Sequence, residues 1–139
     1  MTRILIAAAI VLAAVALAVV VRRRRPDPPT QGVGVVPLQV DRHDFPRPEA
    51  PWLVAVFTSA TCHTCADVVA KTAVLASDDV VTTAVEYGAE RDLHRRYRID
   101  AVPTLVLADA DGVVRGSALG PVTAQDLWAM VADARADPR

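Results

Sequence analysis

Two cysteines, Cys62 and Cys65, are the residues of this chain whose type and spacing are best suited to chemistry. They are the only cysteines among the 139 residues, and His63 and Thr64 lie between them. Cysteines spaced in this way serve as metal ligands, as a structural disulfide, or as a redox couple that alternates between dithiol and disulfide. The residues around the pair must distinguish among these three uses.

A metal site needs more ligands than this pair supplies. Structural zinc takes four ligands, and the chain adds only three histidines to its two cysteines. His63 is badly placed to close a chelate with both cysteines. His43 and His94 are isolated in the sequence, and we interpret each as a surface residue. We therefore expect no metal ion and no other cofactor, with a metallochaperone that uses Cys62, His63 and Cys65 as an alternative.

The segment that contains the cysteines favours the redox couple. Residues 52–58 form an apolar run with the length of a strand buried on both faces, and a helix is expected over residues 65–76. A thiol at the start of a helix faces unpaired backbone N–H groups and the positive end of the helix dipole, and both stabilise the thiolate. We therefore expect Cys62 to attack a disulfide and Cys65 to resolve the mixed disulfide.

Further elements must hold this segment in place. Charged residues 89–97 predict an exposed helix, and residues 123–136 predict a terminal helix that Thr123 caps. Pro37 favours an edge position for the first strand. Alternating strands and helices imply an α/β fold with parallel pairing and one antiparallel edge. The expected strands cover residues 35–40, 52–58, 80–87, 104–109 and 113–119, with a tight turn at 109–112.

Several segments together resemble the thioredoxin-like family. They are the strand, C-x-x-C pair and helix over residues 54–76, the run "YRIDAVPTLVLADADGVV" at 97–114, and Gly120 before the terminal helix. The similarity covers about residues 52–134. It implies a thioredoxin-like mixed sheet with flanking helices, and a thiol–disulfide oxidoreductase. Such an enzyme acts on protein thiols and disulfides, and a redox-recycling partner restores it.

The resemblance also implies roles for residues outside the cysteine pair. The Val102–Pro103 peptide bond is expected to be cis and to lie against the cysteines, with Val102 and Pro103 as substrate-binding residues. A trans proline at the start of a strand is the alternative.

His63, as an imidazolium beside Cys62, would stabilise the thiolate and make the couple more oxidising. As an exposed residue at the start of a helix, it would have little effect.

The chain departs from thioredoxins proper near the cysteines. Thr61 stands where those proteins have tryptophan, and Val56 stands where they have a buried acid. Glu86 on the next strand, or water, is the expected substitute for that acid in managing the proton of Cys65. These departures favour an alternative from another class, a redox-inactive thioredoxin-fold binding module of a membrane assembly.

The N-terminal part of the chain predicts a membrane anchor. Residues 4–21 contain no charged or strongly polar side chain, and a helix of that length covers about 27 Å. A cleaved signal peptide is the alternative, but its apolar region is usually shorter. We expect an anchor with an arginine-rich flank at residues 1–25, a linker at 26–34 and a thioredoxin-like domain at 35–139. The chain would then cross a bacterial-type cell membrane once.

The charged residues bear on location and on partners. Arg22, Arg23, Arg24 and Arg25 follow the apolar segment and favour the cytoplasmic side for the domain, with the extracytoplasmic side as the alternative. From Pro26 onward the chain has all 16 of its acidic residues but only ten of its 15 basic ones. An acidic domain is a poor partner for nucleic acid, so we expect no nucleic-acid binding.

Overall fold

The structure is a computed structural model, and it describes residue 1, residue 11 and residues 13–16 and 36–136 of the chain. The expected linker at 26–34 and most of the expected anchor at 1–25 lie outside the described residues. Among the helices that the structure describes, none is both long enough and apolar enough to cross a membrane.

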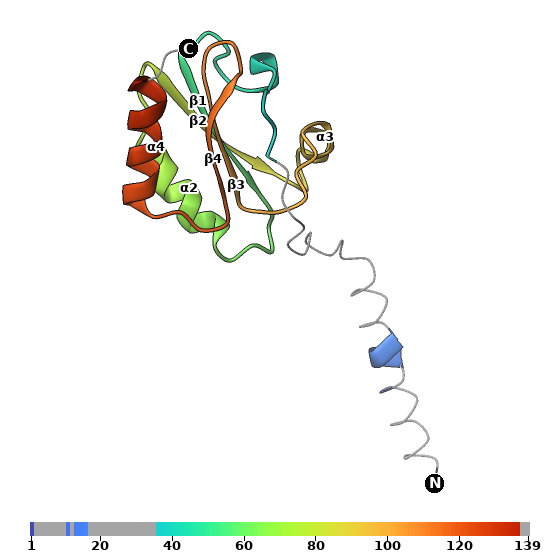
Figure 1. Cartoon of the computed structure of the whole chain (residues 1–139). Helices are drawn as coiled ribbons and strands as arrows, with labels where there is room; N and C mark the ends of the chain where they lie inside the picture. The colour runs from blue at the N-terminus through green and yellow to red at the C-terminus, as the bar shows by residue number, and fades with distance from the viewer. Residues whose placement is uncertain (2–10, 12, 17–35, 137–139) are drawn as a thin grey trace.

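A four-stranded mixed sheet forms the centre of the domain (Figure 1). Its strands lie in the order β2-β1-β3-β4. β1 runs parallel to β2, whereas β3 is antiparallel to both of its neighbours. The mixed α/β sheet with flanking helices confirms the expected fold class. The strands are β1 (Trp52–Thr58), β2 (Val80–Glu86), β3 (Thr104–Ala108) and β4 (Val114–Leu119).

The central strand β1 is buried on both faces. All residues from Leu53 to Phe57 are fully buried, and their side chains alternate between two apolar clusters. On one face α2 (Cys65–Ala73) and α4 (Ala124–Ala136) cover the sheet. On the other face lie the short helices η1 (Arg42–Asp44) and α3 (Arg91–Arg96). The strand therefore holds together two layers of helices.

The strand directions differ in part from the expectation of parallel pairing. Among the described strands, only β1 and β2 form a parallel pair. The helix that follows β2 is α3, which has six residues and so spans about 9 Å, against about 23 Å for the seven-residue strand β2. A helix this short does not return the chain to the opposite end of the sheet, so β3 starts where β2 ends and runs the other way.

The expected first strand at residues 35–40 is not a regular strand in its described part. It makes a single antiparallel bridge, between Gln39 and Val113. Pro37 lacks the N–H that an extended ladder needs. The close approach of this segment to the turn depends on Gly112, which has a φ of +78°. A Cβ atom at Gly112 would lie 1.9 Å from the carbonyl oxygen of Val40, so a larger residue does not fit there.

Two of the three expected helices are shorter than expected, and the terminal helix α4 (Ala124–Ala136) ends at the expected residue. α2 ends at Ala73 instead of residue 76, and α3 occupies Arg91–Arg96 within the expected 89–97. Thr123 caps α4 as expected, because its Oγ1 accepts a hydrogen bond of 3.1 Å from the backbone N–H of Asp126.

His94 is buried, and its interpretation as a surface residue was wrong. Only 2% of this residue is exposed. Its Nε2 lies 3.0 Å from the carbonyl oxygen of Val85, and the rings of Phe57 and Tyr87 meet it edge-on. The charged neighbours of His94 on α3 suggested a helix exposed all round, whereas this short helix turns one side toward the sheet. His43 is exposed, as expected.

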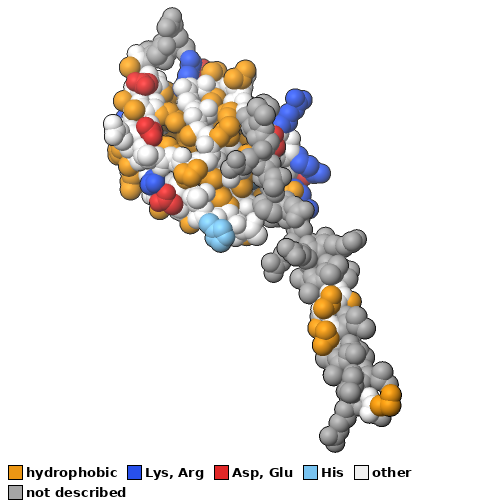
Figure 2. Space-filling model, turned by 60° about the horizontal axis from the view of Figure 1, so that its bottom comes forward, with side chains coloured by type: hydrophobic (Ala, Val, Ile, Leu, Met, Phe, Trp, Pro, Cys, Tyr) orange, Lys and Arg blue, Asp and Glu red, His pale blue; other side chains and the backbone are white. Residues whose placement is uncertain are grey.

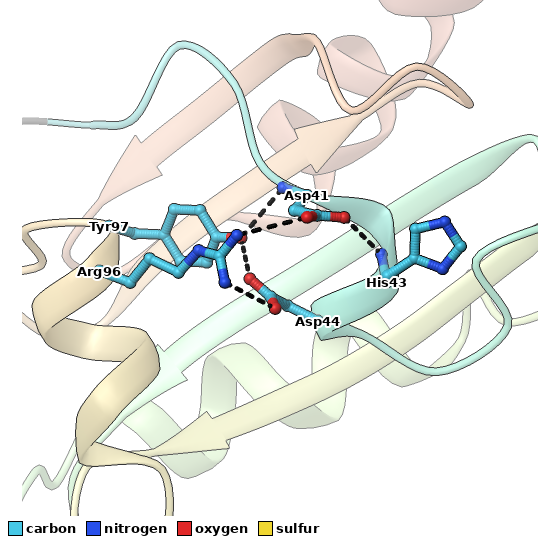
Figure 3. Close-up of polar contacts among 5 residues, drawn as sticks. All are labelled: Asp41, His43, Asp44, Arg96 and Tyr97. Carbon is cyan, nitrogen blue, oxygen red and sulfur yellow. Dashed lines mark hydrogen bonds and ion pairs between the residues drawn. The ribbon is translucent and has the colours of Figure 1, made fainter.

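A polar cluster joins the segment around η1 to α3 (Figure 3). The Tyr97 hydroxyl donates a hydrogen bond to Asp44 and accepts one of 3.0 Å from the backbone N–H of Asp41. Arg96 lies 3.3 Å from a carboxylate oxygen of Asp41 and 3.2 Å from one of Asp44. Burial, and next the hydrogen bond to Asp44, raise the pKa of Tyr97 to about 12. The cluster thus ties residues far apart in the sequence across one face of the sheet.

Replacing Tyr97 with Phe tests this cluster. The ring stays stacked on Phe45, but both hydrogen bonds of the hydroxyl are lost, so we expect the free energy of unfolding to fall by about 1–2 kcal/mol near neutral pH. The pKa of Tyr97 is raised in the folded state, so the hydroxyl stabilises the fold fully below about pH 10 and loses this effect toward pH 12.

Urea unfolding of the full chain in detergent, between neutral pH and about pH 11, measures both effects. The Tyr97→Phe variant should lose less stability at alkaline pH than the wild type, and Tyr87→Phe is the matched control. Equal alkaline losses in the wild type and in Tyr97→Phe would contradict the assignment.

Candidate functional site

One end of the sheet gathers the segments that the sequence singled out. Thr58 at the end of β1 pairs with Glu86 at the end of β2, and Phe57 pairs with Thr104 at the start of β3. Thr104 in turn pairs with Leu119 at the end of β4. We call this the site end of the sheet; it lies at the bottom of Figure 1. The segments that meet there are residues 59–64, 87–90, 101–103 and 120–123.

Cys62 and Cys65 lie at the site end and are joined by a disulfide. Their Cα atoms are 5.5 Å apart. Cys62 belongs to the loop after β1 and is half-buried, whereas Cys65 is the first residue of α2 and only 4% exposed. A partner molecule therefore reaches the sulfur of Cys62 more easily than that of Cys65.

The positions of both cysteines follow from local folding. The buried strand β1 ends at Thr58, and the backbone N–H of Cys62 then donates a hydrogen bond of 3.1 Å to the carbonyl oxygen of Ser59, closing a turn. Val68 on α2 is fully buried against the sheet and holds the start of the helix in place. The cysteines therefore lie at the helix start, where unpaired N–H groups and the dipole favour a negative charge.

The two residues between the cysteines are both exposed. The exposure of His63 agrees with both of its interpretations. Thr64 was not singled out by the sequence, yet its Oγ1 lies 3.7 Å from the Sγ atom of Cys62. A threonine just before a helix is ordinarily interpreted as a helix cap, so the sequence carried no signal for a contact with sulfur.

Glu86 reaches the loop that carries Cys62. Its carboxylate accepts hydrogen bonds from the backbone N–H groups of Ala60, at 3.2 Å, and Ala89, at 2.9 Å. These contacts join the loop after β1 to the loop after β2. Hydrogen bonds from the backbone, first from Gly88 and next from Ala89, lower the pKa of Glu86. A carboxylate with a lowered pKa is a weaker proton acceptor.

The Val102–Pro103 peptide bond is cis, as the family resemblance implied. Pro103 is buried and precedes β3 directly, so it belongs to the site end. Its carbonyl oxygen accepts a hydrogen bond of 2.8 Å from the backbone N–H of Gly120. Val102 is half-buried and packs against the cluster that contains Phe57. The structure thus places Val102 and Pro103 at the same end of the sheet as the cysteines.

The surface at the site end carries few charges. In Figure 2, which brings this end forward, hydrophobic side chains and uncharged atoms make up most of the visible, described face, and acidic and basic side chains lie mostly toward its margins. Val56 lies beneath it, fully buried in an apolar cluster where a thioredoxin proper would have an acid. Among the described residues, no three His, Cys, Asp or Glu side chains gather in a way that would hold a metal ion.

Comparison with known proteins links this geometry to one fold. No protein-family model matches the sequence, and no curated protein matches it. Solved structures do match. The germline-specific thioredoxin Deadhead of Drosophila melanogaster is 22% identical with a TM-score of 0.53, and the match covers 61% of this chain and 82% of that one.

Two further thioredoxins give similar values. Mitochondrial thioredoxin 3 of Saccharomyces cerevisiae, in its oxidised form, is 23% identical over 61% of this chain and 80% of its own, with a TM-score of 0.51. A mutant thioredoxin of Halobacterium salinarum is 24% identical over 60% and 74%, also with a TM-score of 0.51. At these identities the likeness establishes the fold alone. The chain therefore has the thioredoxin fold, with a disulfide-bonded C-x-x-C pair at the site end of its sheet.

Proposed function

We propose that this protein is a thiol–disulfide oxidoreductase that uses the Cys62/Cys65 couple on protein thiols and disulfides. One observation carries the proposal: the pair is disulfide-bonded at the start of α2, with Cys62 accessible and Cys65 buried beneath it. The thioredoxin fold supports it, and so does the position of Val102 and Pro103 at the same end of the sheet.

The reaction proceeds by two exchanges at sulfur. The Cys62 thiolate attacks one sulfur of a substrate disulfide, a new S–S bond forms, and the other substrate sulfur leaves as a thiolate with the electron pair. The Cys65 thiolate then attacks the Sγ atom of Cys62, and the second substrate sulfur leaves. Two electrons have passed from the dithiol to the substrate, and water supplies the protons. The reverse sequence oxidises a substrate dithiol, and a redox-recycling partner restores the starting state.

The role of Glu86 differs from that of a general base. Its carboxylate is held by backbone N–H groups and has a lowered pKa, so it is poorly suited to accept the Cys65 proton. We propose that Glu86 modulates the site by bracing the loop before Cys62, and that water takes the proton of Cys65. His63 remains a proposed modulating residue through its charge beside Cys62.

A redox-inactive binding module is the second candidate. It is favoured by the apolar Val56 and by Thr61, which stand where a thioredoxin proper has a buried acid and a tryptophan. In this case the disulfide would be structural, and the site end would bind a partner without exchange. The first experiment below separates the two candidates.

The oxidoreductase is further proposed to be tethered to a membrane through residues 4–21, with the domain on the cytoplasmic side. The support is the length and apolarity of that segment and the four arginines after it. A tethered domain meets protein thiols close to the membrane surface, which restricts the set of substrates.

Thiol exchange is the first test. We expect the full chain, purified in detergent, to equilibrate between dithiol and disulfide in a glutathione buffer, measured by acid trapping and mass spectrometry. Cys62→Ser should abolish exchange with a disulfide-containing protein. Cys65→Ser should accumulate the mixed disulfide, because the resolving thiol is lost. Wild-type thiols that stay inert in the same buffer would contradict the oxidoreductase and favour the binding module.

Replacing Glu86 with Gln tests whether the Glu86 carboxylate holds the loop before Cys62 in place. We expect faster hydrogen exchange at the amides of Ala60 and Ala89, and slower reaction of both cysteines, because the loop loses its charged acceptor. The pKa of Glu86 is lowered by folding, so its stabilising effect is present above the ordinary pKa of a glutamate and disappears as the pH falls through the folded value. The stability difference between Glu86→Gln and wild type should therefore shrink at acid pH.

The exposed Glu90, on the same loop, supplies the control variant Glu90→Gln. If Glu86 instead acted as the base for Cys65, the Glu86→Gln variant would slow only the resolution of the mixed disulfide. Attack by Cys62 would then proceed at the wild-type rate, and this result would exclude the proposal that Glu86 acts by holding the loop before Cys62.

The membrane side is tested in intact cells. With the domain in the cytoplasm, an impermeant thiol reagent should label Cys62 only after the membrane is opened, and the protein should stay in the membrane fraction after a salt wash. Labelling in unopened cells would overturn the cytoplasmic placement. A mature chain that lacks residues 1–25 would overturn the anchor.

A further inference from the structure

The hydroxyl of Thr64 contacts the sulfur that is proposed to react. Its Oγ1 lies 3.7 Å from the Sγ atom of Cys62, within hydrogen-bonding distance for sulfur. In the disulfide, the Cys62 sulfur carries no hydrogen atom. The hydroxyl is therefore the donor in this contact, and sulfur is the acceptor.

The helix makes no use of this hydroxyl. Thr64 is the residue before α2, where a threonine usually accepts a hydrogen bond from an N–H group of the first turn. Its side chain makes no such bond, and its backbone is already helical, with φ −89° and ψ −15°. Thr123 before α4 shows the ordinary arrangement, since its Oγ1 caps the N–H of Asp126. At the first helix the hydroxyl contacts the sulfur instead.

We propose that Thr64 is a catalytic residue whose hydroxyl donates a hydrogen bond to the Cys62 thiolate. This inference rests on the proposed oxidoreductase function and deepens it. A hydrogen bond to a charged acceptor is shorter and stronger than one between neutral groups, so the contact strengthens when the disulfide is reduced and Cys62 ionises. The hydrogen atom stays on the oxygen throughout, and no proton is transferred.

The bond acts in both directions of the exchange. When Cys62 attacks a substrate, the hydroxyl lowers the pKa of its thiol and raises the thiolate fraction at neutral pH. When Cys62 is the leaving group, the hydroxyl stabilises the thiolate that departs. Because only the reduced form of Cys62 carries the charge, the hydrogen bond favours the dithiol over the disulfide, and the couple becomes more oxidising.

Two substitutions separate the hydroxyl from the rest of the side chain. Thr64→Val keeps the shape and removes the hydroxyl, whereas Thr64→Ser keeps the hydroxyl. In the full chain with Cys65→Ser, the pH dependence of alkylation measures the pKa of the Cys62 thiol. We expect Thr64→Val to raise this pKa by about one unit, which is tenfold in the ionisation constant. Thr64→Ser should stay close to the value of the protein with Thr64.

The redox equilibrium gives a second readout, measured with both cysteines present. Against glutathione, Thr64→Val should shift the equilibrium about tenfold toward the disulfide, about 30 mV for this two-electron couple. The matched control is Thr61→Val, on the other side of Cys62, because the Thr61 hydroxyl lies 3.5 Å from the hydroxyl of Ser59. It should leave both readouts unchanged. The shift caused by Thr64→Val should also persist with His63→Ala, which removes the neighbouring imidazole.

The outcomes for Thr64 and for the oxidoreductase are distinguishable. Thr64 is exposed, so its variants should unfold at the same urea concentration as the wild type. Equal pKa values of the Cys62 thiol with Thr64→Val and with Thr64 would overturn the hydrogen bond. A shift in Thr64→Ser as large as that in Thr64→Val would also overturn it. A wild-type chain with inert thiols would overturn the enzymatic role, while the alkylation profile would still decide whether the hydroxyl contacts the sulfur.

Discussion

The removal of β1 from water on both faces is the constraint on which the rest of the domain depends. Each fully buried leucine, valine or phenylalanine side chain from Leu53 to Phe57 contributes on the order of 1.5–3 kcal/mol, but only if helices cover both sides of the sheet. α2 and α4 do so on one side, and the segment around η1 with α3 does so on the other. The same burial brings the end of β1 to a fixed place, and with it the loop that holds Cys62.

That burial also decides where the polar chemistry of the site lies. Val56 keeps the interior beneath the cysteines apolar, and an ionised group there would carry a large desolvation cost. The polar groups around the cysteine pair are therefore near the surface: the N–H groups at the start of α2, the Thr64 hydroxyl, and the Glu86 carboxylate that contacts the loop before Cys62. Water reaches this surface and screens its charges, which favours short contacts over distant ones in setting the reactivity of Cys62.

The features predicted from the sequence are those that neighbouring residues specify. The run at 52–58, the cysteine pair before a helix and the cap at Thr123 each depend on adjacent residues, and the structure contains all three. The burial of His94 depends on how α3 meets the sheet, and the direction of β3 depends on the length of α3. The Thr64 hydroxyl could either cap an N–H group of the first helical turn or contact the Cys62 sulfur, and only the three-dimensional structure shows that it contacts the sulfur.

The surroundings of Cys62 are held by contacts that do not involve its sulfur. On one side Glu86 ties Ala60 to the loop after β2, and on the other side Val68 holds the start of α2 against the sheet. Neither contact requires the disulfide, so we infer that both thiols stay close together after reduction. A resolving thiol held near its target acts at a high effective concentration, because the entropy of bringing the two groups together is already lost during folding. In the reaction proposed above, the fold thus prepares the second exchange step before any substrate binds.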